Sequence, residues 1–470
     1  MLESPNNVVS EDPPKTYNYF YVAATSCVFL IAATLRVSLS WVNREANDNH
    51  YEVIRLILEG RTGLTMLDCH ECFHPKLFYS VCAFCFQLLS ITDESSRIIA
   101  GQLLNSLAGM LTLVLVFLTI NSSAYPAKWR FWIFTLIAIN PRFIAINGQL
   151  SNDSFAILFA TSAIYFTMTL LKTPSYWSAI VAQGMLSLAL MTKGTTWVVG
   201  IAMLIVLLIR AMNDESRKTS IFFVVLYVIT SLNGLLSIQF AGYDFERYDV
   251  YANRGRGTPL YFWEKTDVGR PGVQSIVDGY MTFRIVSLLR DPQITNSVSI
   301  EQSHRTSVWT QLYARANFAQ YEQHPKSWRT TDRNALSVAK CSIVLGLLPL
   351  AFLLMGIAGG FVRTVGAWRT WGIRGSDYSR FFCSLLCGGY IAFIIKFTAD
   401  YRDFAAIKLI YMLPGVLPFT LAMLDGTQKV AGPLARIRIV RHLLDGILGS
   451  VILLHALGIV LLVRQLANSP

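Results

Sequence analysis

The first side chains in the sequence that could do chemistry lie in residues 47–52, shortly after an apolar run that ends near Trp41. This stretch contains Asp48 and Glu52. An unpaired carboxylate is too costly inside lipid, and tryptophan often marks the boundary between membrane and water. We therefore expect both acids at a membrane surface. For one acid taken alone, the alternative is a solvated polar loop, because most exposed charges only face water.

Other charged side chains also stand where apolar runs end or begin. Asp153 follows Asn152 between two such runs, and its alternative role is to cap the second helix. Lys193 separates two short apolar runs, where it could reach toward the interface or hold a phosphate. Lys408 is expected one turn inside an apolar helix, which is costly unless its ammonium group faces a polar cavity or an anion.

A short polar motif precedes the apolar run 77–91. Residues 71–76 read Glu-Cys-Phe-His-Pro-Lys, and Pro75 suits the first turn of a helix, whose open amides favour an anion. Cys69 and Cys72 have the spacing of metal ligands. We expect no second Cys/His pair to complete a metal site, which argues against zinc and leaves a disulfide or two free thiols.

The composition is that of an integral membrane protein. Hydrophobic residues make up 53% of the chain and charged residues 15%, whereas soluble domains carry about a quarter charged residues. The basic residues behind the net charge of +11 cluster between apolar runs and form no continuous patch, so we expect no nucleic-acid partner. The first apolar run has no small-residue cleavage site after it, and no cleavable signal is expected.

The chain therefore predicts an all-α polytopic membrane protein with about 11 transmembrane helices, each near the length that crosses a bilayer. The expected helices are Asn18–Ser40, Ile98–Ile120, Phe131–Ala145, Ser154–Leu171, Tyr176–Met191, Thr195–Arg210, Ile221–Phe240, Leu336–Ile357, Phe381–Phe397, Ala405–Leu424 and Leu443–Val463.

The short apolar run 77–91 determines the topology. If it lies along the membrane surface as an interfacial helix, the basic loops all fall on one side, as cytoplasmic loops do. If it crosses, those loops fall on the wrong side. We therefore expect a cytoplasmic N-terminus and an external C-terminus.

This topology places the charged motifs on one side and divides the chain into four parts. We expect a cytoplasmic tail (1–17), a transmembrane core (18–240) with a catalytic external loop (41–97), a large external loop (241–335) and C-terminal helices (336–470). The large loop is too long for a plain connector, so we expect a small folded cap.

The order of these motifs resembles the GT-C glycosyltransferases, in the branch of the bacterial aminoarabinose transferases and the protein O-mannosyltransferases. The shared motifs are an acid after the first span, a His-Pro-Pro-Leu-like helix start, an arginine before a long span, a proline followed by Asn-Asp, Thr-Lys-Gly, and a late Tyr-x-Leu-Pro. In this sequence they are Asp48, His74 to Leu77, Arg97, Pro141 with Asn152 and Asp153, Thr192 to Gly194, and Tyr411 to Pro414. The likeness covers residues 18–240 well and 336–424 loosely, and Lys76 replaces the usual second proline.

This resemblance implies inverting transfer of a sugar from a polyprenyl-phosphate donor to a lipid, glycan or protein on the non-cytoplasmic face. It implies Asp48 as the general base. The expected cations around the donor phosphate are Arg97, Lys193, Lys408 and Lys76. The expected acids on the acceptor or metal side are Glu52, Glu71 and Asp153. No cofactor is certain, although a divalent metal ion is possible; the partners are the lipid-linked sugar and membrane lipids.

Two other classes of protein could also place polar groups at helix ends. A transporter or lipid flippase usually shows internal repeats and broken helices near the midplane. The sequence shows no such repeat, and its ionisable residues gather at one face. A structural membrane subunit would leave the acid and lysine motifs without a role. We expect the bacterial inner membrane with a periplasmic site, ahead of the endoplasmic reticulum, and no oligomeric state is indicated.

Overall fold

The computed structural model describes residues 19–65, 68–213, 221–222, 224–229, 272–273, 275–293, 304–321, 325–369, 377–400 and 407–468. Over these ranges the protein is all-helical and contains no strand. The long helices include α1 (Tyr19–Val42), α4 (Glu94–Asn121), α7 (Asp153–Lys172), α9 (Trp197–Asn213), α15 (Arg333–Leu345), α16 (Leu347–Arg369), α17 (Asp377–Asp400), α18 (Val416–Leu434) and α19 (Arg438–Ala467).

Seven helical stretches of the described chain are long and apolar enough to cross a membrane. They become eight if α5 (Ala127–Ala138) and α6 (Pro141–Asn147), which meet at a 47° bend, form one span. The expected number of about 11 stays a prediction. Of the remaining expected spans, α8 (Tyr176–Leu190) is a 15-residue apolar helix, and the span 221–240 falls largely outside the described residues.

Two expected helices have different limits in the structure, and proline explains both differences. We expected one helix over 131–145, but the helix stops at Ala138 and a new one begins at Pro141. The residue before a proline disfavours helical backbone. The side chain of Asn140 instead accepts a bond from the amide of Phe143 at 3.0 Å and caps α6.

The second difference concerns the helix expected over 405–424. The structure starts α18 only at Val416, after two single turns of 3₁₀ helix at Leu409–Tyr411 and Leu413–Gly415. Pro414 has no amide hydrogen and cannot donate the backbone bond of a regular helix, which favours a break there. Lys408 is therefore not one turn inside a helix, as expected, but in extended backbone just before these turns.

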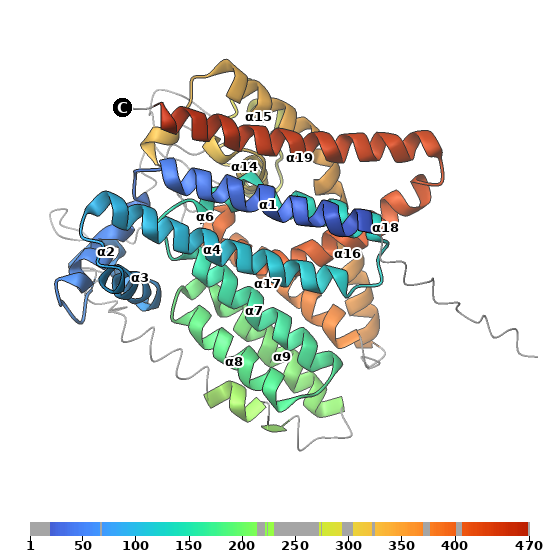
Figure 1. Ribbon diagram of the computed structural model, residues 1–470. Helices are drawn as coiled ribbons and strands as arrows, with labels where there is room; N and C mark the ends of the chain where they lie inside the picture. The colour runs from blue at the N-terminus through green and yellow to red at the C-terminus, as the bar shows by residue number, and fades with distance from the viewer. Residues whose placement is uncertain are drawn as a thin grey trace, which may run out of the picture.

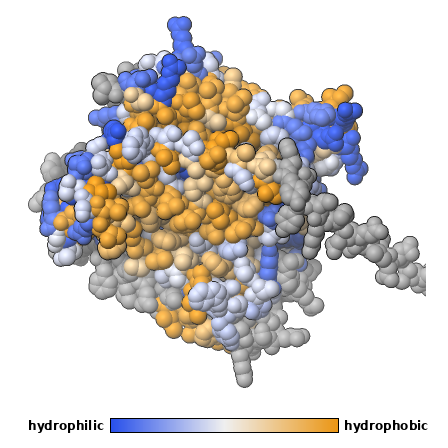
Figure 2. All heavy atoms as spheres, in the orientation of Figure 1, coloured by the Kyte–Doolittle hydropathy of each residue, from blue (hydrophilic) through white to orange (hydrophobic). Residues whose placement is uncertain are grey.

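The hydropathy of the surface agrees with helices that run through a membrane. Figure 2 shows a broad apolar band across the middle of the molecule, between hydrophilic ends. One hydrophilic end lies near α2 (His50–Leu58) and α3 (Leu77–Leu88), and the other lies at the turn between α18 and α19. Helices α1, α4 and α19 run along the direction that joins these ends in Figure 1.

The first long loop folds into a small helical unit of its own. Its two helices share a core that includes Tyr51, Ile54, Phe78 and Phe86. At 1.5 Å per residue, α3 is about 18 Å long, which is short of the ~30 Å hydrocarbon core. Figure 1 shows α3 nearly end-on while α4 runs across the view, so the two helices lie crosswise. An interfacial position for α3 stays a prediction that this geometry supports.

The described part of the large loop is helical and partly enters the helix bundle. It contains α12 (Ile276–Tyr280), α13 (Ile285–Arg290), α14 (Val308–Asn317) and single turns at Ala319–Tyr321 and Lys326–Trp328. Most side chains of α14 are buried, and the hydroxyl of Tyr313 donates to the carbonyl of Ile343 in α15. The side chain of Asn140 reaches the carbonyl of Ala316 at 3.0 Å. The described part of the loop thus packs against the helices, and its position as an external cap stays a prediction.

Candidate active site

Charged side chains from five separate segments meet at one end of the helices. These segments are the start of α2, the 3₁₀ turn η2 (His70–Phe73) with its following residues, the first residue of α7, the connection between α8 and α9, and the segment before α18. The residues that meet are Asp48, His50, Glu71, His74, Tyr79, Asp153, Lys193, Lys408 and Tyr411.

Asp48 sits on a tight turn of left-handed backbone. Its φ and ψ are 47° and 32°, and Asn49 follows with φ 59°. Aspartate and asparagine tolerate this conformation better than most residues because their short polar side chains bond locally. The turn places the carboxylate 3.5 Å from the ammonium nitrogen of Lys408, with 41% of the Asp48 side chain exposed. The proposed base and one proposed phosphate ligand are therefore neighbours, although 360 residues separate them.

Asp153 forms a second and tighter pair with Lys193. Its Oδ1 lies 2.5 Å from the Lys193 Nζ, and the two side chains are only 8% and 10% exposed. Asp153 is the first residue of α7 and not its cap, so the capping alternative is wrong. The side chain of Asn152 donates to the carbonyl of Thr192 at 3.1 Å and holds the two segments together. The Lys193 ammonium also lies 5.8 Å from the centre of the Tyr411 ring.

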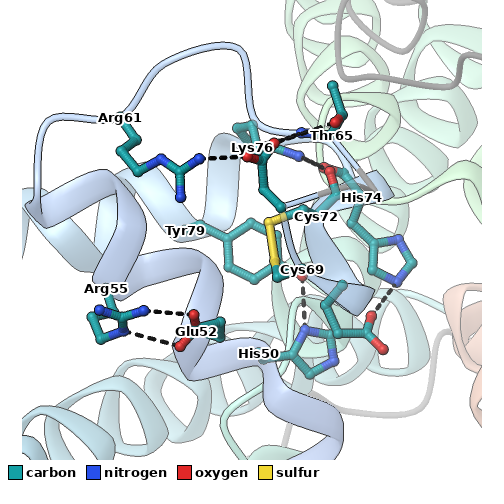
Figure 3. Close-up of a disulfide and its surroundings, with 12 residues drawn as sticks. His50, Glu52, Arg55, Arg61, Thr65, Cys69, Cys72, His74, Lys76 and Tyr79 are labelled. Atoms are coloured by element: carbon teal, nitrogen blue, oxygen red, sulfur yellow. Dashed lines mark hydrogen bonds and ion pairs between the residues drawn. A yellow bond between two sulfur atoms is a disulfide. The ribbon is translucent and has the colours of Figure 1, made fainter. Parts of the chain in front are cut away.

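The turn before α3 carries a disulfide and a Glu–His pair. Cys69 and Cys72 are bonded, so the structure resolves the alternatives that the sequence left open. Glu71, between them, places its carboxylate 3.0 Å from Nε2 of His74, and both side chains are nearly buried. Figure 3 shows His74 beside the disulfide, with its ring directed toward this carboxylate. The disulfide thus closes the turn that presents Glu71 and His74.

His50 links this turn to the start of α2. Its Nδ1 lies 2.7 Å from the Tyr79 hydroxyl, and its ring stacks on His74 with centroids 5.9 Å apart. Burial lowers the pKa of His50 to about 4, against the opposite effect of the Glu71 carboxylate. His50 is therefore neutral at neutral pH. Burial also raises the pKa of Tyr79 well above its ordinary value, so the phenol stays protonated.

Three residues expected in the site make their described contacts with residues close to them in the sequence. Glu52 forms a two-bond pair with Arg55 on the outer side of α2, at 2.7 and 3.0 Å. Arg97 donates from Nε to the carbonyl of Ile91 at 2.9 Å. Lys76 donates to the carbonyls of Cys72 and His74, and burial lowers the pKa of its ammonium to about 8. The roles of these three in a site stay predictions.

Sequence reasoning missed His50 and Tyr79 and mentioned His74 only as part of a motif. His50 is two residues from Asp48, which is the one local signal that could have drawn attention to it. Tyr79 has no such signal, because its contact depends on how α3 packs against α2. Tyr79 bonds to His50, and His50 is two residues from the proposed base.

The described residues contain no group of three or more His, Cys, Asp or Glu side chains that could hold a metal ion. The expectation of a possible divalent metal thus stays a prediction. Among its charged groups, the site has two carboxylates paired with two lysines, and one of these pairs is buried whereas the other is partly exposed. A carboxylate can accept a proton from a hydroxyl group, and ammonium groups can stabilise a phosphate that leaves.

Comparison with known proteins gives one family match and several structures with a similar fold. Residues 74–233 match the family model described as dolichyl-phosphate-mannose-protein mannosyltransferase. No match to a curated protein sequence was found. The family match includes the second half of the first long loop and all of α4 to α9.

The fold is shared with an oligosaccharyltransferase from Archaeoglobus fulgidus. Its apo structure superposes with a TM-score of 0.50 and 13% identity, over 96% of this chain and 56% of that one. A structure of the enzyme with an inhibitory peptide and a dolichol-phosphate gives a TM-score of 0.49 and 12% identity, with the same coverage of the two chains. A structure with Zn and sulfate gives a TM-score of 0.49 and 13% identity, over 94% of this chain and 53% of that one. This chain spans little more than half the length of the archaeal enzyme.

A second protein matched by structure is ArnT from Cupriavidus metallidurans bound to undecaprenyl phosphate. Its TM-score is 0.36 at 14% identity, over 88% of this chain and 78% of that one. The family match and the fold shared with the archaeal enzyme together confirm the resemblance that the sequence motifs indicated.

Proposed function

We propose that this chain, which resembles the GT-C glycosyltransferases, transfers a sugar from a polyprenyl-phosphate donor to a hydroxyl group of an acceptor. The observation that carries the proposal is the meeting of two acid–lysine pairs at one end of the transmembrane helices. The acceptor is a lipid, a glycan or a protein. A donor anchored in the bilayer requires a site at this level, since its phosphate lies at the membrane surface.

Asp48 is the proposed general base. Its carboxylate is partly exposed and can be reached by an acceptor hydroxyl, whereas Asp153 is buried against Lys193. As the acceptor oxygen bonds to the anomeric carbon of the sugar, its proton passes to Asp48. The bond from that carbon to the phosphate oxygen breaks, and its electron pair leaves with the polyprenyl phosphate. One such displacement inverts the configuration at the anomeric carbon.

The lysines on the same side are the proposed ligands of the phosphate. Lys408 is the accessible one, since 28% of its side chain is exposed. Lys193 is already bonded to Asp153 and lies near Tyr411, so its charge acts from a fixed position. Cations that are fixed before the reaction stabilise the charge that develops on a leaving group. Lys76 and Arg97 are additional proposed ligands.

The proposed site faces the non-cytoplasmic side, and two observations support this orientation. A disulfide such as Cys69–Cys72 persists in oxidising compartments and is rare in the cytosol. The basic turn between α18 and α19, with Arg436, Arg438 and Arg441, lies at the opposite end of the molecule, as expected for a cytoplasmic loop. We propose the periplasmic face of a bacterial inner membrane.

Sugar transfer by the purified protein tests the function. A polyprenyl-phosphate donor with a labelled sugar is incubated with an acceptor extract, and label in the acceptor fraction is measured with and without the protein. Asp48→Asn should lower turnover by about 10²–10⁴-fold, which is the usual contribution of a general base. Glu59→Gln is the matched control, because Glu59 bonds only to Arg55 among its described ionic contacts and lies at the end of α2.

The control separates the role of Asp48 from a general effect of charge. Glu59→Gln removes the same charge from the same helical unit and should leave transfer within twofold of the parent protein. If Asp48→Asn folds normally and transfers sugar within tenfold of the parent, Asp48 is not the base. If the parent transfers no labelled sugar from any polyprenyl-phosphate donor, the proposed function is wrong.

A further inference from the structure

The turn between α6 and α7 is irregular backbone inside the helix bundle. Residues 148–152 belong to no helix, yet every residue from 141 to 154 is buried. Carbonyl groups that leave a helical ladder in such a place need other donors, because burial keeps water away from them. Helix α4 packs against both α6 and α7, so its side chains can reach this turn.

Asn105 of α4 donates two bonds to the turn. Its side-chain nitrogen lies 2.7 Å from the carbonyl oxygen of Gln149 and 2.8 Å from that of Ser151, and the residue is fully buried. Gly101, one turn earlier on the same face of α4, leaves room for Leu150, because a β-carbon there would lie 2.3 Å from the Leu150 Cδ1 atom. This face of α4 thus receives one side chain of the turn and bonds to the carbonyls on either side of it.

Other side chains hold the start of the turn. Ser106 of α4 donates to the carbonyl of Asn147 at 3.2 Å, and Asn43 of α1 donates to that of Gly148 at 3.1 Å. The bonds from Asn105 lie further along the chain, on the part of the turn that leads into α7.

The turn that Asn105 holds carries the buried acid–lysine pair. Asp153 follows the turn directly, as the first residue of α7, and its carboxylate lies 2.5 Å from the ammonium nitrogen of Lys193. Asn152, the last residue of the turn, donates to the carbonyl of Thr192 at 3.1 Å. The position of the turn therefore determines where both members of the pair stand.

We infer that Asn105 is a positioning residue for sugar transfer, because its two bonds to the turn keep Asp153 beside Lys193. This inference rests on the proposed function, in which Lys193 is a fixed cation near the leaving phosphate. Asn105 bonds to buried backbone and acts only through the pair. A displacement of about 1 Å can lower a rate about 10²-fold. Losing both bonds should therefore slow the transfer, although no charged group has been removed.

The first test measures how firmly Lys193 is held, without any substrate. The purified protein is treated with limiting acetic anhydride, and the rate of acetylation at Lys193 is measured by peptide mass spectrometry relative to the exposed Lys326. In Asn105→Leu, leucine has a similar shape but no donor. This variant should raise the ratio about tenfold, since two net hydrogen bonds that oppose local opening are lost.

Thr112→Val is the matched control for this test. Thr112 is also fully buried in α4, and its hydroxyl donates to the carbonyl of Ala108 in the same helix at 2.9 Å. Thr112→Val should leave the acetylation ratio unchanged. An unchanged ratio in Asn105→Leu, or an equal rise in both variants, would overturn the inference.

The second test uses turnover to separate positioning from stability. The kcat of sugar transfer is measured at a temperature at which all variants remain folded, in the parent and in Asp153→Asn/Lys193→Met. If Asn105 acts through the pair, Asn105→Leu should lower kcat about 10²-fold in the parent but by less than about twofold where the pair is absent. Equal losses in the two backgrounds would show a general effect of instability and would contradict the inference. So would a parent-like kcat of Asn105→Leu.

A second variant and the substrate-free test keep the outcomes distinct. If Asn105→Leu does not fold, Asn105→Ser replaces it, because a hydroxyl group can donate to only one of the two carbonyls. Changes in the same direction are expected, and values equal to those of the parent would contradict the inference. If the parent transfers no sugar, the proposed function fails, while the acetylation ratio still shows whether Asn105 holds Lys193. If the parent transfers sugar and the ratio does not change, only the inference about Asn105 is wrong.

Discussion

Nδ1 of His50 lies 2.7 Å from the hydroxyl oxygen of Tyr79, and this bond ties the start of α2 to the first turns of α3. His50 is two residues from Asp48 and is buried. The bond therefore fixes the turn that carries the proposed base from its inner side. The ring of His50 must stay neutral in this environment, which makes the contact sensitive to acid.

We predict that acid weakens the fold through His50. Burial lowers its pKa from 6.5 to about 4 in the folded protein, so the unfolded chain binds a proton more readily. The stability due to neutral His50 is thus fully present above pH 6.5 and is lost as the pH falls toward 4. The full difference corresponds to about 3 kcal/mol. Thermal midpoints of the parent and His50→Gln, measured from pH 7.5 to 4.5, check this.

The comparison of the parent with His50→Gln isolates the effect of one histidine on the pH dependence of stability. Glutamine does not titrate, so the midpoint of His50→Gln should fall less steeply with acid than that of the parent. His442→Gln is the matched control, because His442 is exposed and its removal should not change the slope. Equal slopes for the parent and His50→Gln would show that His50 does not titrate with folding.

A second prediction concerns orientation in the membrane. Met281, in the large loop, and Ile439, at the start of α19, are 75% and 79% exposed. In a protein whose exposed Cys27 and Cys341 are replaced by serine, Met281→Cys should react with an impermeant thiol reagent in intact cells. Ile439→Cys should react only after the cells are opened. The reverse pattern would place the proposed site on the cytoplasmic side.

The third prediction concerns the disulfide between Cys69 and Cys72. The bond closes a very short loop, so its loss should cost about 2 kcal/mol of stability in the chain-entropy account. Turnover should also fall, because the closed turn presents Glu71 next to His74. Activity and thermal midpoint are measured with and without reductant for the parent and for Cys69→Ser/Cys72→Ser. The double variant should no longer respond to reductant, and a parent that does not respond would remove the bond from this role.

Much of the site could be predicted from the sequence because charge and membrane position leave few options. Asp48, Asp153, Lys193 and Lys408 stand beside apolar runs, and a consistent topology puts them on one side. The structure pairs them as two acid–lysine contacts. Which acid pairs with which lysine was not predictable, since that depends on the packing of helices that are far apart in the sequence.

The differences between the expected and observed helix limits have a local cause. The breaks before Pro141 and around Pro414 follow from the missing amide hydrogen of proline and were hidden by the continuous hydrophobicity of those runs. The burial of α14 against α15 was not part of the prediction, whereas the position of the large loop outside the membrane stays a prediction. The buried residues of α14 bond to one another and to neighbouring helices, which removes the cost of burial.

The last prediction asks whether the Asp153–Lys193 pair is only structural. Removing one member, by Asp153→Asn or Lys193→Met, leaves the other charge almost fully buried and should cost about 3–5 kcal/mol of stability. The variant Asp153→Asn/Lys193→Met removes both charges, so it should lose much less stability than the two single variants lose in sum. Thermal or denaturant unfolding of all four proteins gives these values.

The activity of the double variant then shows whether the pair also contributes to sugar transfer or is only structural. If Lys193 contributes a fixed positive charge to the leaving phosphate, the double variant should be stable but should transfer sugar at least about 10²-fold more slowly, as when one stabilising donor is removed. A double variant that recovers both stability and transfer would show that the pair only holds α7 to the α8–α9 connection. The phosphate would then depend on Lys408, and the single variant Lys193→Met would owe its loss of activity to unfolding alone.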